Sequence, residues 1–132
     1  MKPKKILVVE DDLDMFKALT IRLEANGFET LLSTSVVTSV AMVRIDPPDL
    51  IVLDLGLPDG DGYSVMERLK SIPEARSIPV IVLTARDPEG NQERSYGGGA
   101  YDFFQKPVNE EWLLESIRRA LARTSPMGPL PE

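Results

Sequence analysis

Three uninterrupted apolar runs constrain the fold more than any other feature of this sequence. They are Ile6–Val9, Leu50–Leu53 and Val80–Leu83, and each contains β-branched residues. Runs that are apolar at every position, rather than at every second position, suit strands that are covered on both faces, as in a parallel sheet. We therefore expect three buried strands at these places. Two weaker strands are expected at residues 28–33 and around Phe103-Phe104.

The segments between these runs carry apolar residues at helical spacing. One helix is expected before the C-cap pair Asn26-Gly27, a second before Pro47-Pro48, and a third before Pro73. Their apolar faces are predicted to be Phe16, Leu19 and Leu23, then Val36, Val40, Val43 and Ile45, then Val65, Met66, Leu69 and Ile72. A last helix is expected from an Asn109 N-cap to Arg123. Its inner face is predicted to hold Trp112, Leu113, Ser116, Ile117, Ala120 and Leu121.

Strands that alternate with helices indicate βαβ units, and five units in this length fit a small, doubly wound α/β domain over residues 1–123. The segment 86–99 is the exception. It has three consecutive glycines and only Tyr96 as a large apolar residue, so a helix there should be short and poorly anchored. Residues 124–132 are expected to be a flexible, proline-rich tail or linker.

The composition excludes several kinds of chemistry. The 132 residues include no cysteine and no histidine, which excludes disulfides, zinc–thiolate sites and every mechanism that needs an imidazole in this chain. The formal net charge is −6, from 15 basic and 21 acidic residues, and an acidic chain is poorly suited to direct contact with nucleic acid. Chemistry must come from carboxylates, hydroxyls, lysine or a hard metal ion.

No apolar stretch approaches the length that is needed to cross a bilayer, and the run behind the basic N-terminus is too short for a signal peptide. The balance of 42% hydrophobic and 27% charged residues is that of a globular protein. We expect a cytoplasmic, single-domain protein.

Reactive residue types follow the predicted strands. Glu10 and Asp11 follow the first run, Asp54 follows the second, Thr84 follows the third, and Lys106 follows Phe103-Phe104. Because the carboxyl ends of parallel strands lie at one edge of the sheet, these groups should converge there. A single acid after a strand is usually a solvated turn residue, but four strands that end in this way favour a site.

Gathered carboxylates repel one another, at a cost of about 4 kcal/mol for a pair about 4 Å apart at an effective dielectric near 20. A divalent cation removes that cost, and Mg²⁺ suits an open oxygen site with room for a phosphate oxygen. Lysine and threonine beside such a carboxylate would stabilise phosphoryl oxygens. The predicted chemistry is therefore phosphoryl transfer to an aspartate.

Four stretches resemble the receiver domain of response regulators in two-component, phosphorelay signalling. They are KILVVEDD at 5–12, PDLIVLDLGLPDGDG at 48–62, IPVIVLTA at 78–85 and GAYDFFQKP at 99–107. The resemblance covers residues 4–123. It implies a flavodoxin-like, five-stranded parallel sheet in the order 2-1-3-4-5, with helices on both faces.

The resemblance also implies roles for single residues. Asp54 corresponds to the phosphoacceptor. The implied Mg²⁺ ligands are Glu10 through water, Asp11, Asp54 and the backbone carbonyl of Gly56. Thr84 and Lys106 correspond to the groups that bind the phosphoryl oxygens, Phe103 together with Thr84 to the conformational switch, and the Lys106-Pro107 bond to a cis peptide.

The implied function is a phosphorylation-dependent switch, and not an enzyme. With no histidine in the chain, the phosphoryl donor is expected to be a sensor histidine kinase, a histidine phosphotransfer protein or a small acyl phosphate. In the family that these stretches resemble, the fourth helix forms the dimer face together with the last strand and the last helix. Because the 86–99 segment is weakly anchored, we expect a monomer or a weak, phosphorylation-dependent dimer. The effector, and whether the domain acts alone or within a longer regulator, stay open.

Two other functions remain as alternatives. One is a receiver-like interaction module that is not phosphorylated, which the intact acids, Thr84 and Lys106 disfavour. The other is a haloacid-dehalogenase-like phosphatase, which needs a second aspartate where Gly56 stands.

Several residues near the predicted site are expected to have structural roles. Asp12 is expected to assist the site or to cap a helix, 59–62 to form a turn, Asp49 to begin a strand, Asp102 to be solvated, and Trp112 to lie in the core or an interface.

Overall fold

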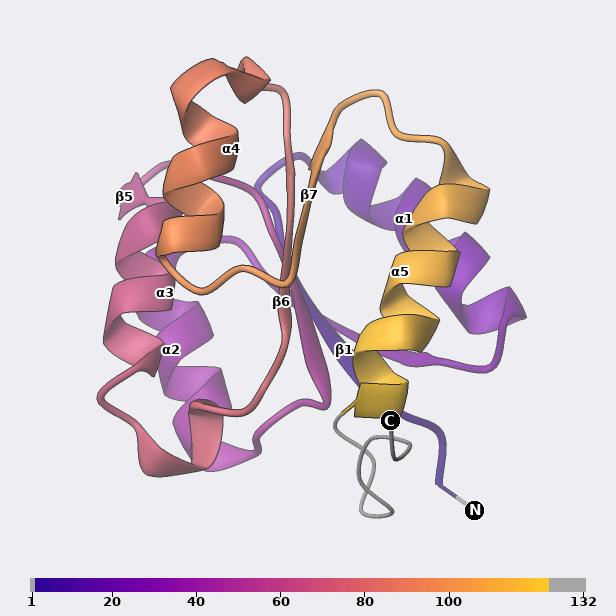
Figure 1. The fold of residues 1–132 in the computed structure, drawn as a ribbon. Coiled ribbons are helices and arrows are strands. Elements are labelled where there is room, and N and C mark those ends of the chain that lie inside the picture. The colour runs from indigo at the N-terminus through magenta and orange to yellow at the C-terminus, as the bar shows by residue number, and fades with distance from the viewer. Residues whose placement is uncertain (1, 124–132) are drawn as a thin grey trace, which may run out of the picture.

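A parallel five-stranded sheet forms the centre of the computed structural model, which describes residues 2–123 (Figure 1). Its strands are β1 (Lys5–Val9), β2 (Glu29–Ser33), β3 (Leu50–Leu53), β6 (Val80–Thr84) and β7 (Asp102–Gln105). They lie in the order β2-β1-β3-β6-β7, and every neighbouring pair is parallel. Numbered within the sheet, this is the order 2-1-3-4-5, so the expected doubly wound fold is confirmed.

Four α-helices connect the strands, namely α1 (Leu13–Ala25), α2 (Val36–Ile45), α3 (Gly62–Leu69) and α4 (Pro88–Gly97), and a fifth, α5 (Glu110–Arg123), follows β7. A short 3-10 helix, η1 (Pro73–Ala75), precedes β6. The first amides of a helix have no partner within it, and a polar side chain in front of each helix accepts from them. These side chains are Asp12, Ser35, Asp61, Asp87 and Asn109; Asn109 was predicted as a cap, and capping was one of the two roles expected of Asp12.

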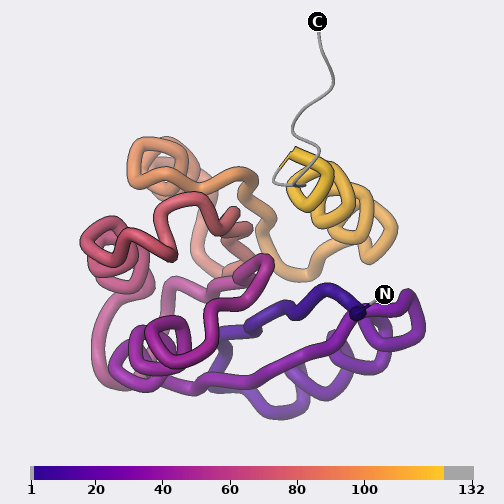
Figure 2. Tube along the Cα trace, turned by 90° about the horizontal axis from the view of Figure 1, so that it is seen from below, coloured from indigo at the N-terminus to yellow at the C-terminus, as the bar shows by residue number. Residues whose placement is uncertain are grey.

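The helices form two layers, one on each face of the sheet (Figures 1 and 2). Helices α1 and α5 cover one face, and α2, α3 and α4 cover the other. Alternate strand residues belong to different cores. Ile6 and Val8 of β1 pack with α1 and α5, whereas Leu7 and Val9 pack with α2 and α3. Successive side chains of a strand point to opposite faces, so burial on both sides requires apolar residues at every position.

A small hairpin joins β3 to α3. Its strands β4 (Gly56–Leu57) and β5 (Gly60–Asp61) are antiparallel, and the turn between them lies at 58–59, so a turn is present but earlier than the expected 59–62. The hairpin tip also reaches α2, because Asp59 accepts hydrogen bonds from the amides of Val36 at 2.8 Å and Val37 at 3.2 Å. One loop thus fixes the starts of two helices.

Helix α4 forms within the doubtful 86–99 segment, but it is irregular. Its backbone is non-helical at Glu89 and at Gly90, where φ is +77°, so the first turn is kinked away from the rest. Ser95 is its only buried residue. The expected weak apolar attachment is therefore present, although the segment is helical.

Two predicted inward positions are wrong, and one predicted helical position lies outside its helix. Ile45 is 84% exposed and Trp112 is 64% exposed, because at about 3.6 residues per turn each lies away from the centre of its helix's buried face. In α5 the buried position that the prediction missed is Leu114. Ile72 is buried but follows α3, which ends at Leu69 before Pro73 begins η1.

The described residues end at Arg123 of α5, so the predicted boundary there and the expected tail at 124–132 stay predictions, and the tail lies outside the described residues. Within residues 2–123, no helix combines the length and the apolar character that a membrane span requires.

Candidate phosphoacceptor site

The strand register brings the predicted site residues to one edge of the sheet. Val9 of β1 pairs with Leu53 of β3, so Glu10 and Asp54 leave neighbouring strands at the same level. The Asp54 amide continues the ladder by donating to the Val9 carbonyl at 3.0 Å. On the other side of β3, the Lys106 amide donates to the Thr84 carbonyl at 2.7 Å. Residues from β1, β3, β6 and β7 therefore meet, as the sequence predicted.

Lys106 connects the two buried acids. Its ammonium lies 2.6 Å from Glu10 Oε1 and 3.1 Å from Asp54 Oδ2. The Glu10 side chain is 5% exposed and that of Asp54 is 11% exposed, so both interactions are largely shielded from solvent. The Lys106-Pro107 peptide is cis, as the resemblance implied.

A third acid completes a group that is able to hold a cation. One carboxylate oxygen each from Glu10, Asp11 and Asp54 lies within 4.8 Å of the other two. Asp11 is exposed while the other two acids are buried, so the group opens to solvent on one side. Three carboxylates at an open site are the hard oxygen ligands that Mg²⁺ prefers.

Gly56 contributes its amide to this group, since it donates to Asp54 Oδ1 at 3.2 Å. Gly56 also has no atom within 4 Å of where a Cβ would stand, so the space that a side chain at this position would occupy is open. A ligand role for its carbonyl remains a prediction.

The electrostatics differ between the two buried acids. Burial raises the pKa of the Glu10 carboxyl, and the hydrogen bond from Lys106 offsets this only in part. Burial also acts to raise the pKa of Asp54, but the Gly56 amide and the Lys106 charge outweigh it, and the pKa is lowered. Burial alone would lower the pKa of Lys106, yet its bonds to the two acids raise it. Asp54 and Lys106 are therefore held in their charged forms.

The two predicted switch residues are both buried. Thr84 is 1% exposed, and its hydroxyl accepts a hydrogen bond from the Arg86 amide at 3.3 Å. Phe103 is 7% exposed and belongs to the core beneath α2 and α3. The aromatic ring therefore occupies an inward position in this structure.

Comparison with known families assigns the chain to a family. Residues 6–118 match the family described as the response regulator receiver domain, which is most of the chain. The chain belongs to this family. As a receiver domain of two-component systems, it carries the acidic group, the lysine and the hydroxyl at the strand ends, where its sequence placed them.

Two relatives show how the receiver domain compares in length. It is 36% identical over 125 residues to the phosphate regulon transcriptional regulatory protein PhoB of Escherichia coli K12, covering 95% of this chain and 55% of PhoB. It is 34% identical over 119 residues to the polar-differentiation response regulator DivK of Brucella anthropi, covering 90% of this chain and 97% of DivK. The chain thus spans about half the length of PhoB but nearly all of DivK.

A solved structure is also similar. The receiver domain of a sensor histidine kinase from Pseudomonas aeruginosa PAO1 superposes with a TM-score of 0.83 at 27% identity, covering 90% of this chain and 98% of that one. That structure holds a magnesium ion coordinated in its active-site cleft.

Several acids of the receiver domain have structural roles. Asp12 caps α1, and its own amide donates to Glu10 Oε2 at 3.2 Å, so it also steadies a site residue. Asp49 accepts from the Lys5 amide at 2.7 Å as β3 begins. Asp102 is not the solvated residue that was expected. It is half-buried and accepts from Ser116 Oγ at 2.7 Å and Tyr96 OH at 3.1 Å, because three elements meet around it.

The sequence reasoning missed two contacts beside Asp54, namely the close packing of Gly62 and the partners of Arg86. A Cβ on Gly62 would lie 2.5 Å from the Asp54 carbonyl oxygen and 2.7 Å from the Leu55 Cα, so only glycine lets α3 begin there. Arg86 bridges the Asp61 carboxylate and the Leu55 carbonyl. A glycine directly after a capping aspartate was the available signal for the first, and the second has no local signal.

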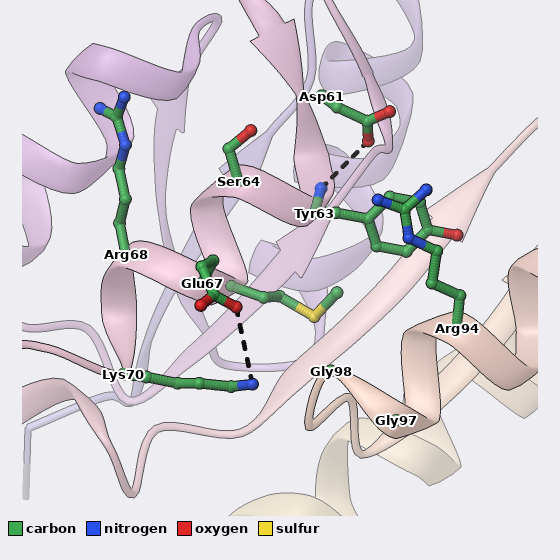
Figure 3. Close-up of a pocket in the computed structure, with 10 residues that line it drawn as sticks. Asp61, Tyr63, Ser64, Glu67, Arg68, Lys70, Arg94, Gly97 and Gly98 are labelled. Carbon is green, nitrogen blue, oxygen red and sulfur yellow. Dashed lines mark hydrogen bonds and ion pairs between the residues drawn. The ribbon is translucent and has the colours of Figure 1, made fainter.

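A separate groove of about 620 Å³ lies between α3 and α4 (Figure 3). Tyr63 crosses it, donating from its hydroxyl to Asn91 Oδ1 at 2.7 Å, and the Arg94 guanidinium lies 3.8 Å from the centre of its ring. These polar contacts attach α4 to α3 in place of an apolar interface. Asp61 lines the groove at the end where α3 begins.

Proposed function

We propose that this receiver domain is a Mg²⁺-dependent phosphorylation switch in which Asp54 accepts a phosphoryl group. The observation that carries the proposal is the arrangement of three carboxylates with Lys106 bridging two of them. A lysine held between buried acids supplies positive charge where phosphoryl oxygens would arrive, and the acids supply ligands for a metal. The magnesium in the similar kinase receiver domain supports the same interpretation.

In the proposed reaction, an Asp54 carboxylate oxygen forms a bond to phosphorus while the bond from phosphorus to the donor's imidazole nitrogen breaks. The electron pair of that bond stays on the imidazole. The Gly56 amide and Lys106 keep Asp54 ionised and oriented for attack. Mg²⁺, held by Glu10, Asp11, Asp54 and the Gly56 carbonyl, would neutralise charge on the transferring phosphoryl group.

The added negative charge then needs new partners. Lys106 is close enough to transfer its hydrogen bonds from Glu10 and Asp54 to the phosphoryl oxygens. The Thr84 hydroxyl already helps to lower the pKa of Asp54, so it is near enough to bind the same oxygens, and a shift of its side chain towards them would bias Phe103. A ligand shifts a two-state element only through such differential contacts.

The partner in this proposal is a sensor histidine kinase or a histidine phosphotransfer protein, in keeping with the two-component family. The domain would be the substrate and switch of this reaction and not an enzyme, because Gly56 stands where an aspartyl phosphatase would need its second acid. We propose that it acts as a monomer or a weak phosphorylation-dependent dimer, without direct nucleic-acid contact. A cytoplasmic location belongs to the same proposal.

The direct test is the intact mass of the protein after incubation with acetyl phosphate and Mg²⁺. We expect the mass of one added phosphoryl group in the native chain, none with EDTA, none for Asp54→Asn, and an unchanged gain for Asp59→Asn. A second arm measures Mg²⁺-dependent binding of beryllium trifluoride, a stable phosphoryl mimic, by calorimetry. Failure of both arms would overturn the proposal and favour a receiver-like module that binds its partner unmodified.

A further inference from the structure

The guanidinium group of Arg86 has two acceptors in this structure. Its Nη1 lies 3.1 Å from Asp61 Oδ2, and its Nη2 lies 3.2 Å from the Leu55 carbonyl oxygen. The side chains of Arg86 and Asp61 are 37% and 39% exposed, so this ion pair is at the surface and can open.

Asp61 is the fixed member of the pair. Its Oδ1 accepts from the Tyr63 amide at 3.1 Å, which caps α3 (Figure 3). The next residue, Gly62, packs on the Asp54 backbone and donates to the Leu55 carbonyl at 2.8 Å. The Asp61 carboxylate is therefore held by the helix start on one oxygen and offers the other to Arg86. Arg86, with its long side chain, is the member that can move.

Arg86 belongs to the loop beside the acceptor. It follows Thr84 by two residues, and its amide donates to the Thr84 hydroxyl at 3.3 Å. The Leu55 carbonyl that it contacts comes directly after Asp54. The Lys106 ammonium is already shared between Glu10 and Asp54, so it neutralises only part of the charge that a phosphoryl group on Asp54 would add. A second cation would stabilise the remaining charge. Guanidinium is well suited to it, because it binds phosphoryl oxygens with two parallel N–H groups.

We propose that Asp61 is a positioning residue that holds Arg86 in the unphosphorylated protein and competes with the phosphoryl group on Asp54 for it. The proposal rests on the proposed function of Asp54. By stabilising the Arg86 position of the resting state, Asp61 disfavours the phosphorylated state, since Arg86 must leave Asp61 before it can pair with the new charge. The strength of the Arg86–Asp61 ion pair therefore affects the equilibrium between the unphosphorylated and phosphorylated conformations.

The test is a double-mutant cycle with Mg²⁺ and beryllium trifluoride as the probe, measured by calorimetry on the full chain. Asp61→Asn keeps a side-chain oxygen for the Tyr63 amide but removes the charge that holds Arg86. We expect it to bind the probe about threefold to fivefold more tightly than the native protein, as for a partly exposed charge pair. In an Arg86→Ala background, the same substitution should change the affinity by less than about twofold.

Asp59→Asn is the matched control, because it removes one charge from the same loop at a residue that caps α2 and does not contact Arg86. It should bind the probe as the native protein does. Equal tightening by Asp59→Asn, or equal tightening with and without Arg86, would overturn the role of Asp61 and point to general charge instead. Absence of probe binding by the native protein, together with no gain of mass from acetyl phosphate, would overturn the proposed function itself, which separates the two failures.

Discussion

Gly62 lies against the backbone of Asp54 so closely that a Cβ added to it would stand 2.5 Å from the Asp54 carbonyl oxygen. The obstructing atoms are backbone and cannot rotate aside. The first turn of α3 therefore packs directly on the segment that carries the candidate phosphoacceptor.

Gly62→Ala is expected to lower the free energy of unfolding by about 1–3 kcal/mol, because either α3 or the Asp54 segment must shift. It should also reduce phosphoryl uptake from acetyl phosphate. Urea denaturation measures the first effect and intact mass the second. Gly97→Ala is the control, since a Cβ there meets no atom within 4 Å and lies in α4. Equal stability of the two variants would contradict the proposed close packing.

Asp11→Asn is expected to weaken Mg²⁺ binding about tenfold, because it removes one charged ligand from the group of three acids. The measurement is a Mg²⁺ titration by calorimetry, with EDTA-treated protein as the starting state. Asp14→Asn makes the same change of net charge at an acid in the first turn of α1, outside the group. An equal loss in both variants would mean that Mg²⁺ responds only to the overall charge.

Lys106→Ala is expected to accept a phosphoryl group but to lose the conformational response. Trp112 is the single tryptophan, and it lines a shallow pocket together with Phe103, Phe104 and Pro107, so its fluorescence reports on the switch region. Phosphorylation should change that fluorescence in the native protein and leave it nearly unchanged in the variant. Intact mass must show equal phosphorylation in both samples. A full fluorescence change in phosphorylated Lys106→Ala would contradict the role of Lys106 in the conformational response.

The stability of the protein is expected to depend on pH through Asp59. The hydrogen bond from the Val36 amide, with a second from Val37, holds the pKa of Asp59 below its usual range in the folded protein. The folded state therefore favours the ionised carboxyl. This stabilisation is fully present above the unfolded pKa of about 4, and it is lost as the pH falls through the lowered folded value.

Asp59→Asn removes this contribution, so its Tm should be below that of the native protein at pH 7 and should approach it in acid. The measurement is the difference in Tm between the two proteins over a pH series. A difference that stays constant from neutral to acid pH would show that the Asp59 charge does not cap α2.

The strands and helices could be predicted from the sequence for reasons that are local, whereas the strand order came from the resemblance to receiver domains. A strand that is covered on both faces needs apolar residues throughout, and the runs Ile6–Val9, Leu50–Leu53 and Val80–Leu83 meet that need. Asn109 and Asn26-Gly27 marked helix ends through their own backbone chemistry. The site could be predicted as well, because a parallel sheet brings every carboxyl end to one edge.

Local patterns were less reliable at the margins of helices. Ile45 and Trp112 were assigned to inner faces because they are apolar, yet both are mostly exposed. Apolarity alone does not decide burial, since the position around the helix also matters. Helix α4 shows the reverse case, in which polar contacts from Tyr63 attach a segment that has little apolar character.

The sequence by itself determined which residues form the strands, which helices connect them and which chemical groups reach the carboxyl edge, because each depends on neighbours within a few positions. Only the tertiary structure decided which groups touch. Lys106 meets Glu10 across 96 positions, Arg86 meets Asp61 across 25, and Gly62 makes room for the Asp54 backbone. These contacts depend on strand register and loop paths, and periodicity along a single element carries no information about either.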